Sequence, residues 1–231
     1  MDYLINSFLN ALQLIITLDR STFNVVSTTL VVTFYSTFFS TVFGILTAFY
    51  LVYFKLPINY FLKVIFNTLL SLPTVVVGLF VYVLIMQSGI FGKYNLLFTK
   101  KAIIIGQTIL AYPIVVSLTT SALENYDKRL REFLITLGVS PFRLIATIIW
   151  EARLGVIIAI ITAYGRVVSE VGASMILGGN IKGYTRTITT AIALETSKGE
   201  FINGLALGII LLVISLLINI FIYSLRKIWA L

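Results

Sequence analysis

The stretch "LREFLITLGVSPFRLIATIIWE", residues 130–151, interrupts a chain that otherwise consists mostly of long apolar runs. Its charged residues include Arg131, Glu132, Arg143 and Glu151. In its middle, Gly138 to Pro141 form a cluster of residues typical of a turn. A charged segment of this kind is unusual in the middle of a very apolar chain. Its role is therefore a guide to the fold.

The apolar side chains before the turn follow helical spacing. They stand at positions i, i+3, i+4 and i+7, namely Leu130, Phe133, Leu134 and Leu137. Gly138 predicts the end of this helix, and Ser140 followed by Pro141 predicts the start of the next. An amphipathic helix in a loop needs a cover for its apolar face. Periodicity alone does not decide whether lipid headgroups or a groove on another protein buries this face.

The composition places the chain in a membrane. Of 231 residues, 59% are hydrophobic and only 11% are charged, too few to cover the surface of a soluble domain. Backbone groups in hydrocarbon must be satisfied internally, which leaves helices or a closed barrel. Because the apolar runs are long and do not alternate, we expect an all-α, polytopic helical bundle.

Five apolar runs approach or exceed the ~20 residues that cross a bilayer. They cover residues 25–53, 61–86, 102–123, 144–163 and 202–225. Residues 4–18 are apolar but short, so we expect an interfacial or partly inserted helix in residues 1–20, with a short sixth span as the alternative. Residues 21–231 then form one transmembrane domain.

Several classes of chemistry are excluded by residue counts. The chain has no Cys and no His, which argues against thiol chemistry and the usual zinc or copper sites, and we predict no catalytic or metal-binding residues. The closest match to a phosphate-binding loop, Gly178 to Gly183, is followed by Tyr184 where a lysine is required. We therefore expect no cofactor, no ATP and no nucleic acid on this chain.

The opening stretch resembles the signature loop of importer permeases of the ATP-binding-cassette class. Glu132, Gly138 and Ile148 stand at the spacing of that signature, although Phe133 and Leu134 replace its two alanines and Trp150-Glu151 replace its Leu-Pro. In that family the loop helix inserts into a cleft on the ATPase. The resemblance makes residues 124–150 a cytoplasmic coupling loop. Its predicted ATPase-coupling residues are Leu130, Glu132, Phe133, Leu134, Leu137 and Gly138.

Two further stretches resemble tungstate-importer permeases, and more loosely molybdate ones. They are "GRVVSEVGASMILGGNIKGYTRTITTAIALETSKGEF" at 165–201 and "SLPTVVVGL" at 71–79. The resemblance implies a type I importer fold with two copies of the permease, an ATPase dimer on the cytoplasmic side and an extracytoplasmic oxyanion-binding protein. ATP and Mg would be bound by the ATPase.

The interiors of the apolar runs offer candidates for a translocation pathway. Pro73 and Pro113 each remove a backbone hydrogen bond and predict a kink, either structural or a hinge at a gate. Ser71 and Thr74 beside Pro73 could offer hydroxyls to a passing oxyanion. In the first span, small and hydroxyl residues recur at helical spacing, which favours a helix-packing face over contact with substrate. They are Thr33, Ser36, Thr37, Ser40, Thr41, Gly44 and Thr47.

The outer half of the chain is unusually basic. The net charge is +8, and with the 124–153 loop inside, nine of the 17 Lys and Arg residues lie on the inner side and eight on the outer. Arg166 and Glu170 stand four residues apart. They either form an ion pair with each other or have a functional role in transport. With Lys182 and Arg186, Arg166 is a candidate for a positive funnel at the mouth of the pathway.

We therefore expect a multi-pass permease of the cell membrane that imports an oxyanion, tungstate in the first place. Molybdate, sulfate or phosphate are alternatives. A standalone channel or an assembly subunit is the alternative from another class. With five spans, the N-terminus is extracytoplasmic and the C-terminus cytoplasmic.

Overall fold

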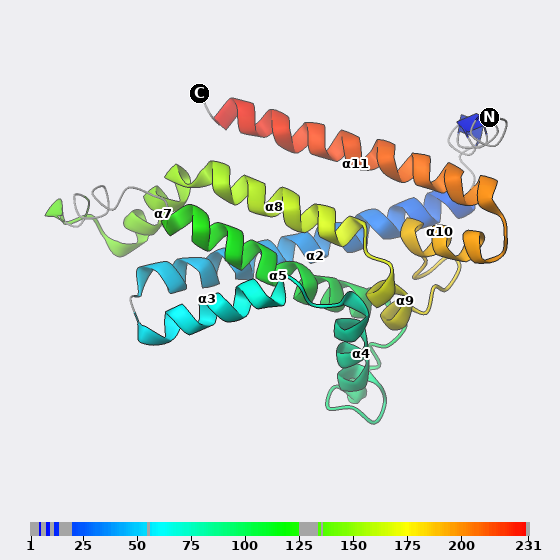
Figure 1. The fold of residues 1–231 in the computed structure, drawn as a ribbon, viewed down its shortest axis with the longest axis horizontal. Helices are drawn as coiled ribbons and strands as arrows, with labels where there is room; N and C mark the ends of the chain where they lie inside the picture. Colours follow the sequence, from blue (N-terminus) through cyan, green and yellow to red (C-terminus); the bar gives the residue numbers. More distant parts are fainter. Residues whose placement is uncertain are drawn as a thin grey trace.

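The computed structural model describes residues 20–54, 56–124 and 136–229, together with residues 5, 8, 9, 12, 13 and 134. Within these residues the regular structure is helical and contains no strand (Figure 1). The predicted all-α class is confirmed. The predicted interfacial helix of residues 1–20 falls almost entirely outside the described residues.

The helices follow one another along the chain with short connections. They are α2 (Arg20–Tyr53), α3 (Pro57–Leu69), α4 (Thr74–Ile85), the 3-10 turn η1 (Gly92–Tyr94), α5 (Lys100–Glu124), α7 (Pro141–Glu151), α8 (Arg153–Val168), α9 (Gly172–Gly178), α10 (Ile188–Ser197) and α11 (Phe201–Trp229). Three of them are long and apolar enough to cross a membrane, and two bent pairs raise the number of spans to as many as five.

The first span packs on the third through its small residues. Helix α2 has 34 residues and buries Thr33, Ser36, Ser40 and Gly44 along one side. A Cβ at Gly44 would lie 2.6 Å from Cγ1 of Val115 on α5, so the two backbones approach closely. The predicted packing face of small and hydroxyl residues is confirmed for these four positions.

The second span was expected at residues 61–86 with a kink at Pro73, and the structure breaks it there into two helices. Helices α3 and α4 meet at a bend of 107°. Pro73 begins α4 as its N-cap, with φ −64° and ψ 125°, because a proline has no N–H for the preceding turn and disfavours helical backbone at the residue before it. Pro113, by contrast, lies inside α5, and that helix continues through it.

The fourth span also departs from the expected continuous run of residues 144–163. Helix α7 begins at Pro141, at the position predicted from Ser140 and Pro141, and ends at Glu151. Helix α8 then starts at Arg153 and continues to Val168. After a short break α9 leaves at 61° to α8, so the chain bends a second time.

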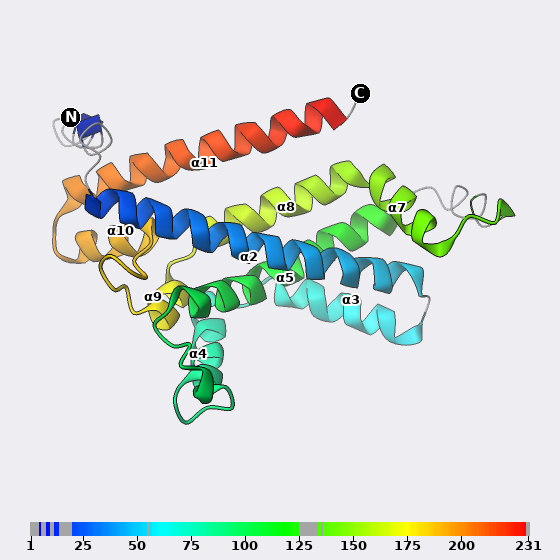
Figure 2. The same ribbon diagram turned by 180° about the vertical axis from the view of Figure 1, so that it is seen from behind.

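The long helices lie side by side, and α4 projects away from them (Figures 1 and 2). Helix α2 begins at the end of the molecule where α9 and α10 lie, and α11 runs back from that end toward the side of α7. The start of α2 and the end of α11 thus lie toward opposite ends of the molecule.

Candidate functional site

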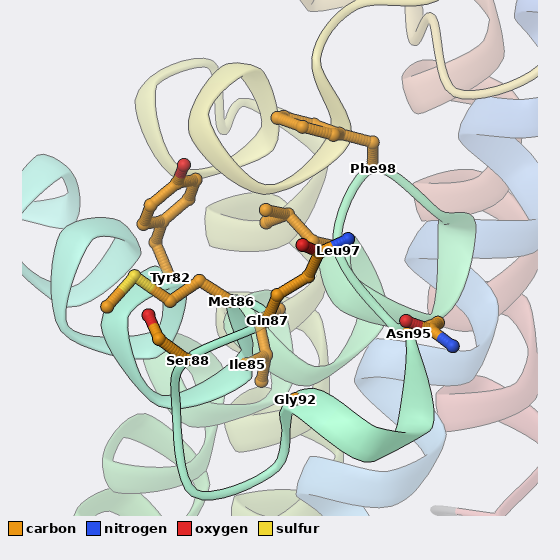
Figure 3. A pocket seen from close by; sticks show the side chains of 9 residues that line it. All are labelled: Tyr82, Ile85, Met86, Gln87, Ser88, Gly92, Asn95, Leu97 and Phe98. Carbon is orange, nitrogen blue, oxygen red and sulfur yellow. The ribbon is translucent and has the colours of Figure 1, made fainter.

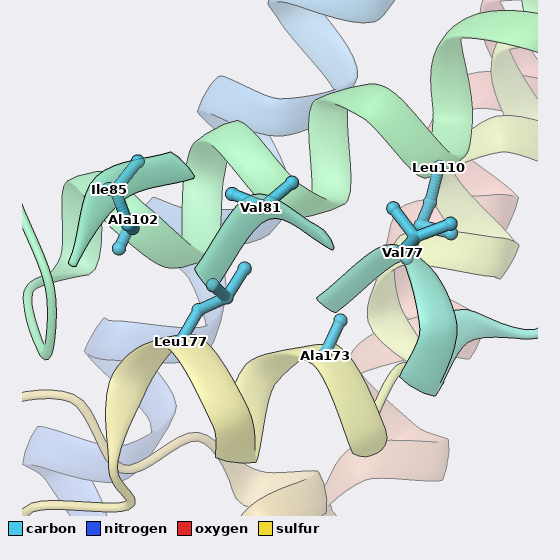
Figure 4. Packing of buried hydrophobic residues seen from close by; sticks show 7 residues of the cluster. All are labelled: Val77, Val81, Ile85, Ala102, Leu110, Ala173 and Leu177. Atoms are coloured by element: carbon cyan, nitrogen blue, oxygen red, sulfur yellow. The ribbon is translucent and has the colours of Figure 1, made fainter. Parts of the chain in front are cut away.

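The two bends meet in space. Helix α4, which follows the first bend, packs against α9, which follows the second, and both pack on α5. The buried cluster between them contains Val77, Val81, Ile85, Ala102, Leu110, Ala173 and Leu177 (Figure 4). Glycine makes the contact possible, because a Cβ at Gly78 would lie 2.9 Å from the Cα of Ala173. The structure therefore joins the two interrupted spans through their short halves.

Two predicted pathway residues from different spans come together at this contact. A Cβ at Gly172 would lie 3.5 Å from Oγ1 of Thr74 and 3.6 Å from Oε1 of Glu170. Thr74 is half-buried, whereas Ser71 and Pro73 are exposed. The Ser71 hydroxyl donates to the backbone oxygen of Thr68 at 2.8 Å. Of the three candidates around Pro73, Thr74 lies nearest the interior.

Glu170 holds the start of α9. Its side chain is buried, with 5% exposure, and its Oε1 accepts a hydrogen bond from the backbone N–H of Ala173 at 2.9 Å. Its backbone oxygen accepts from the Thr189 hydroxyl at 2.8 Å. A carboxylate that accepts from the first turn of a helix satisfies a donor that would otherwise lack a partner. Glu170 thus positions α9 and ties it to α10.

Arg166 does not pair with Glu170 among the described ion pairs. The four-residue spacing was one basis for expecting such a pair, but α8 ends at Val168 and the chain turns before Glu170. Arg166 is exposed in the last turn of α8. Its positive charge there is favourable at a helix C-terminus.

The loop between α9 and α10 carries the other two predicted cations. Lys182 is exposed, and Arg186 is half-buried. The Arg186 guanidinium donates from Nε to Oδ1 of Asn180 at 3.2 Å and from Nη2 to the Asn180 backbone oxygen at 3.3 Å. Arg186 therefore shapes the loop, while Lys182 is the more accessible charge. The loop that carries them lies between α9 and α10, at the end of the molecule where α8 ends (Figure 1).

The threonines around Arg186 are committed to local structure. Thr187 is the N-cap of α10 and forms a capping box with Thr190. Its hydroxyl also lies 3.0 Å from that of Thr189, and the Thr185 hydroxyl donates to the backbone oxygen of Gly178. All four side chains are buried. These hydroxyls are therefore used within the loop and the start of α10.

A buried amide links three helices and was missed from the sequence. Gln107 on α5 is 2% exposed, donates from Nε2 to the Ser174 hydroxyl of α9 at 2.9 Å, and accepts from the Ser36 hydroxyl of α2 at 3.3 Å. A glutamine inside an apolar span was the available signal, because such an amide needs partners on neighbouring helices.

A hollow lies beside the outer end of α4. It has a volume of about 610 Å³ and is lined by residues that include Tyr82, Met86, Gln87, Asn95 and Phe98 (Figure 3). No charged side chain is among its lining residues. By itself it therefore has no positive charge to attract an anion.

The predicted coupling residues that the structure describes, Leu134, Leu137 and Gly138, lie next to α7, at the opposite end from α9 and α10 (Figure 1). Leu137 is 61% exposed, and Gly138 has a φ of +68°, the left-handed conformation expected where a helix ends. Leu134 instead packs against the chain's own cluster of Leu144, Ile148 and their neighbours. Leu130, Glu132 and Phe133 lie outside the described residues. Among the described residues, Leu137 is therefore the better candidate for contact with a partner.

The long apolar helices and the two bent helix pairs define a multi-pass membrane protein in which the bent pairs pack on each other. The chain belongs to the family described as the binding-protein-dependent transport system inner membrane component, whose family model matches residues 40–229. It is thus a membrane-embedded permease of the importer type, as the sequence predicted.

Named relatives match almost the whole chain. The tungstate uptake system permease protein TupB of Campylobacter jejuni subsp. jejuni serotype O:2 is 43% identical over 98% of this chain and 95% of its own length. TupB of Peptoclostridium acidaminophilum is 35% identical over 98% of this chain and 100% of its own. The molybdenum transport system permease protein ModB of Escherichia coli K12 is 31% identical over 77% of this chain and 82% of its own.

A solved structure shares the fold. The methionine ABC transporter MetNI, solved in inward-facing conformations, contains a chain that matches with a TM-score of 0.72 at 18% identity. The match covers 91% of this chain and 94% of that one. The predicted type I importer permease fold is confirmed.

Proposed function

We propose that this chain is the transmembrane subunit of a tungstate importer. The observation that carries the proposal is the 43% and 35% identity to two tungstate permeases across nearly the full length of each chain. Molybdate is the second candidate cargo, since a molybdenum permease is 31% identical over a smaller part of the chain. Relatives named as probable sulfate permeases are 25% and 22% identical, which favours the heavier oxyanions.

The energy source in this proposal is a separate ATPase dimer, which binds ATP and Mg and hydrolyses the nucleotide. It docks at the end of the molecule where Leu137 is exposed. That end is cytoplasmic, so the N-terminus is outside and the C-terminus inside. A second copy of the chain completes the membrane unit, membrane lipid surrounds it, and an extracytoplasmic binding protein delivers the oxyanion at the α9–α10 end.

The two bends provide the moving part of this mechanism. A straight helix resists bending, whereas a break at Pro73 or between α8 and α9 allows one half to rotate against the other. Because α4 and α9 pack on each other, the two halves move as a unit. The permease then needs only weak contact with its cargo, since tight binding would slow release.

Reconstitution tests the proposal. The chain, its ATPase and the binding protein are placed in proteoliposomes, and tungsten and molybdenum accumulation are measured by mass spectrometry with and without ATP. We expect ATP-dependent accumulation that is fastest for tungstate. Faster molybdate transport would reassign the cargo. Oxyanion flux without ATP and ATPase would instead identify a channel.

A further inference from the structure

A polar cleft lies between α3 and α5, in the half of the molecule that leads toward the coupling loop. On α3, Lys63 and Asn67 are one helical turn apart, and on α5 Ser117, Thr120 and Glu124 recur at helical spacing. Nζ of Lys63 donates to Oε1 of Glu124 at 2.5 Å, and the Ser117 hydroxyl donates to Oδ1 of Asn67. The two helices are thus joined by polar side chains at both ends of a hollow.

The hollow has room for a small ion. Its volume is about 110 Å³, compared with about 30 Å³ for one molecule of liquid water. Thr120 lines it, is only 5% exposed, and has a buried hydroxyl oxygen without a hydrogen-bond partner in the described structure. A buried hydroxyl without a partner is costly, so such a group indicates that water or a ligand completes it.

The charges around the hollow suit an anion that must leave again. Lys63 supplies a cation, and the Thr120 hydroxyl and the Asn67 amide N–H groups supply donors within the same lining. In the described structure the Glu124 carboxylate forms an ion pair with the Lys63 ammonium group. Both side chains are partly exposed, at 27% and 48%, so the pair is weak and an incoming anion can displace the carboxylate.

We propose that this cleft is a transient binding site for the transported oxyanion on the cytoplasmic half of the pathway, an inference that rests on the proposed function. Lys63 binds the anion by charge, and Thr120 donates a hydrogen bond to one of its oxygens. Glu124 competes with the anion for Lys63 and so speeds its release. A site with its own competing carboxylate binds weakly, as a transport pathway requires.

The chain offers a close control for the hydroxyl. Thr119, the next residue of α5, is also buried and also has a hydroxyl oxygen without a described partner, yet it does not line the cleft. Thr119→Val and Thr120→Val therefore remove the same group from neighbouring positions. Only the second should alter anion binding. Lys63→Met removes the cation, Lys63→Arg retains it, and Glu124→Gln removes the competitor.

The test is equilibrium dialysis of radioactive or mass-detected tungstate against the permease–ATPase complex in lipid nanodiscs without nucleotide, with the ATPase alone as blank. We expect Glu124→Gln to bind about tenfold more tightly than the unaltered complex, since its cation is free for the anion. Within the Glu124→Gln background, Thr120→Val should weaken binding about tenfold, Lys63→Met should abolish it, and Lys63→Arg and Thr119→Val should preserve it.

Two outcomes would contradict the proposed anion site without contradicting the proposed function. One is tungstate transport by the unaltered complex together with no gain of binding in Glu124→Gln. The other is equal losses in Thr119→Val and Thr120→Val. Thermal unfolding of each variant accompanies the dialysis, and the gain in Glu124→Gln cannot arise from misfolding. Failure of the unaltered complex to transport any oxyanion would instead count against the proposed function.

Discussion

Gly78 of α4 lies directly on Ala173 of α9, so close that a Cβ at position 78 would stand 2.9 Å from the Cα of Ala173. The obstructing atom belongs to the backbone and cannot rotate away. The contact therefore fixes how near the two short helices approach, and through them how the interrupted spans are joined.

Gly78→Ala should push α4 away from α9. Overpacking of a tight interior contact costs about 1–3 kcal/mol, and we expect a lower thermal unfolding midpoint together with slower uptake. Gly208→Ala on α11 is the matched control, because a Cβ there meets nothing within 4 Å. Equal effects of the two substitutions would show that the α4–α9 contact has no special importance.

Gln107→Leu should loosen α9 from α5 and α2. It removes the donor to Ser174 and the acceptor for Ser36, and interhelical hydrogen bonds in membranes contribute about 0.5–2 kcal/mol. Thermal unfolding in detergent measures the loss. Thr108→Val is the control, since that hydroxyl bonds only within its own helix, to Ile104. A Gln107→Leu chain as stable as Thr108→Val would contradict the interpretation of this amide as a link.

Leu137→Asp and Leu134→Asp should impair the permease in different ways, the first by loss of ATPase binding and the second by loss of stability. Leu137 is exposed, so its substitution should leave the chain stable but release the ATPase. Leu134 is partly buried against the chain's own cluster, and a carboxylate there loses hydration and apolar contacts, which destabilises the fold. Co-purification of the ATPase and thermal unfolding separate the two effects. Retention of the ATPase by Leu137→Asp would remove this residue from the docking surface.

Glu170→Ala should destabilise α9, whereas Glu170→Gln should not. The glutamine keeps an oxygen that can accept from Ala173, while alanine leaves that N–H without its partner, a loss of about 0.5–2 kcal/mol. Thermal unfolding is again the measurement. If Glu170→Gln is as unstable as Glu170→Ala, the negative charge itself contributes at the start of α9, beyond the hydrogen bond to Ala173.

Lys182→Gln should slow tungstate uptake at low ionic strength. An exposed cation at the mouth of a pathway raises the local concentration of anions, and a loss of about twofold is expected to vanish as salt screens the charge. Lys198→Gln is the control, because Lys198 is already paired with Glu195 at 3.1 Å. A uniform loss at all salt concentrations would argue for a structural role instead of steering.

The spans could be predicted from hydropathy because each is a long apolar run. Pro73 and Pro113 both predicted kinks, but which of the two breaks its helix could not be predicted. Pro73 and Pro113 look alike in sequence. One begins a new helix after a sharp bend and the other lies within a continuous helix. A proline weakens the helix locally, and packing with neighbours decides whether the helix breaks there.

Single candidate residues could be chosen from the sequence, but their contacts in the fold could not be predicted. Arg166 and Glu170 suggested an ion pair because helical spacing was assumed across both, and the end of α8 at Val168 removes that premise. Gln107 was overlooked because one amide barely changes the hydropathy of its span. Its importance depends on Ser36 and Ser174, which are distant in sequence and meet it only in the fold.

The length of α2 has a consequence for the membrane around the protein. At 1.5 Å per residue, its 34 residues extend about 50 Å, whereas the hydrocarbon layer is about 30 Å thick. The helix must therefore lean or project beyond the layer, and the thickness of the bilayer governs how far. Because Gly44 locks α2 onto α5, any change in its tilt is passed to α5 and the bends packed on it. Acyl-chain length thus becomes a means of adjusting the transport rate without altering a residue.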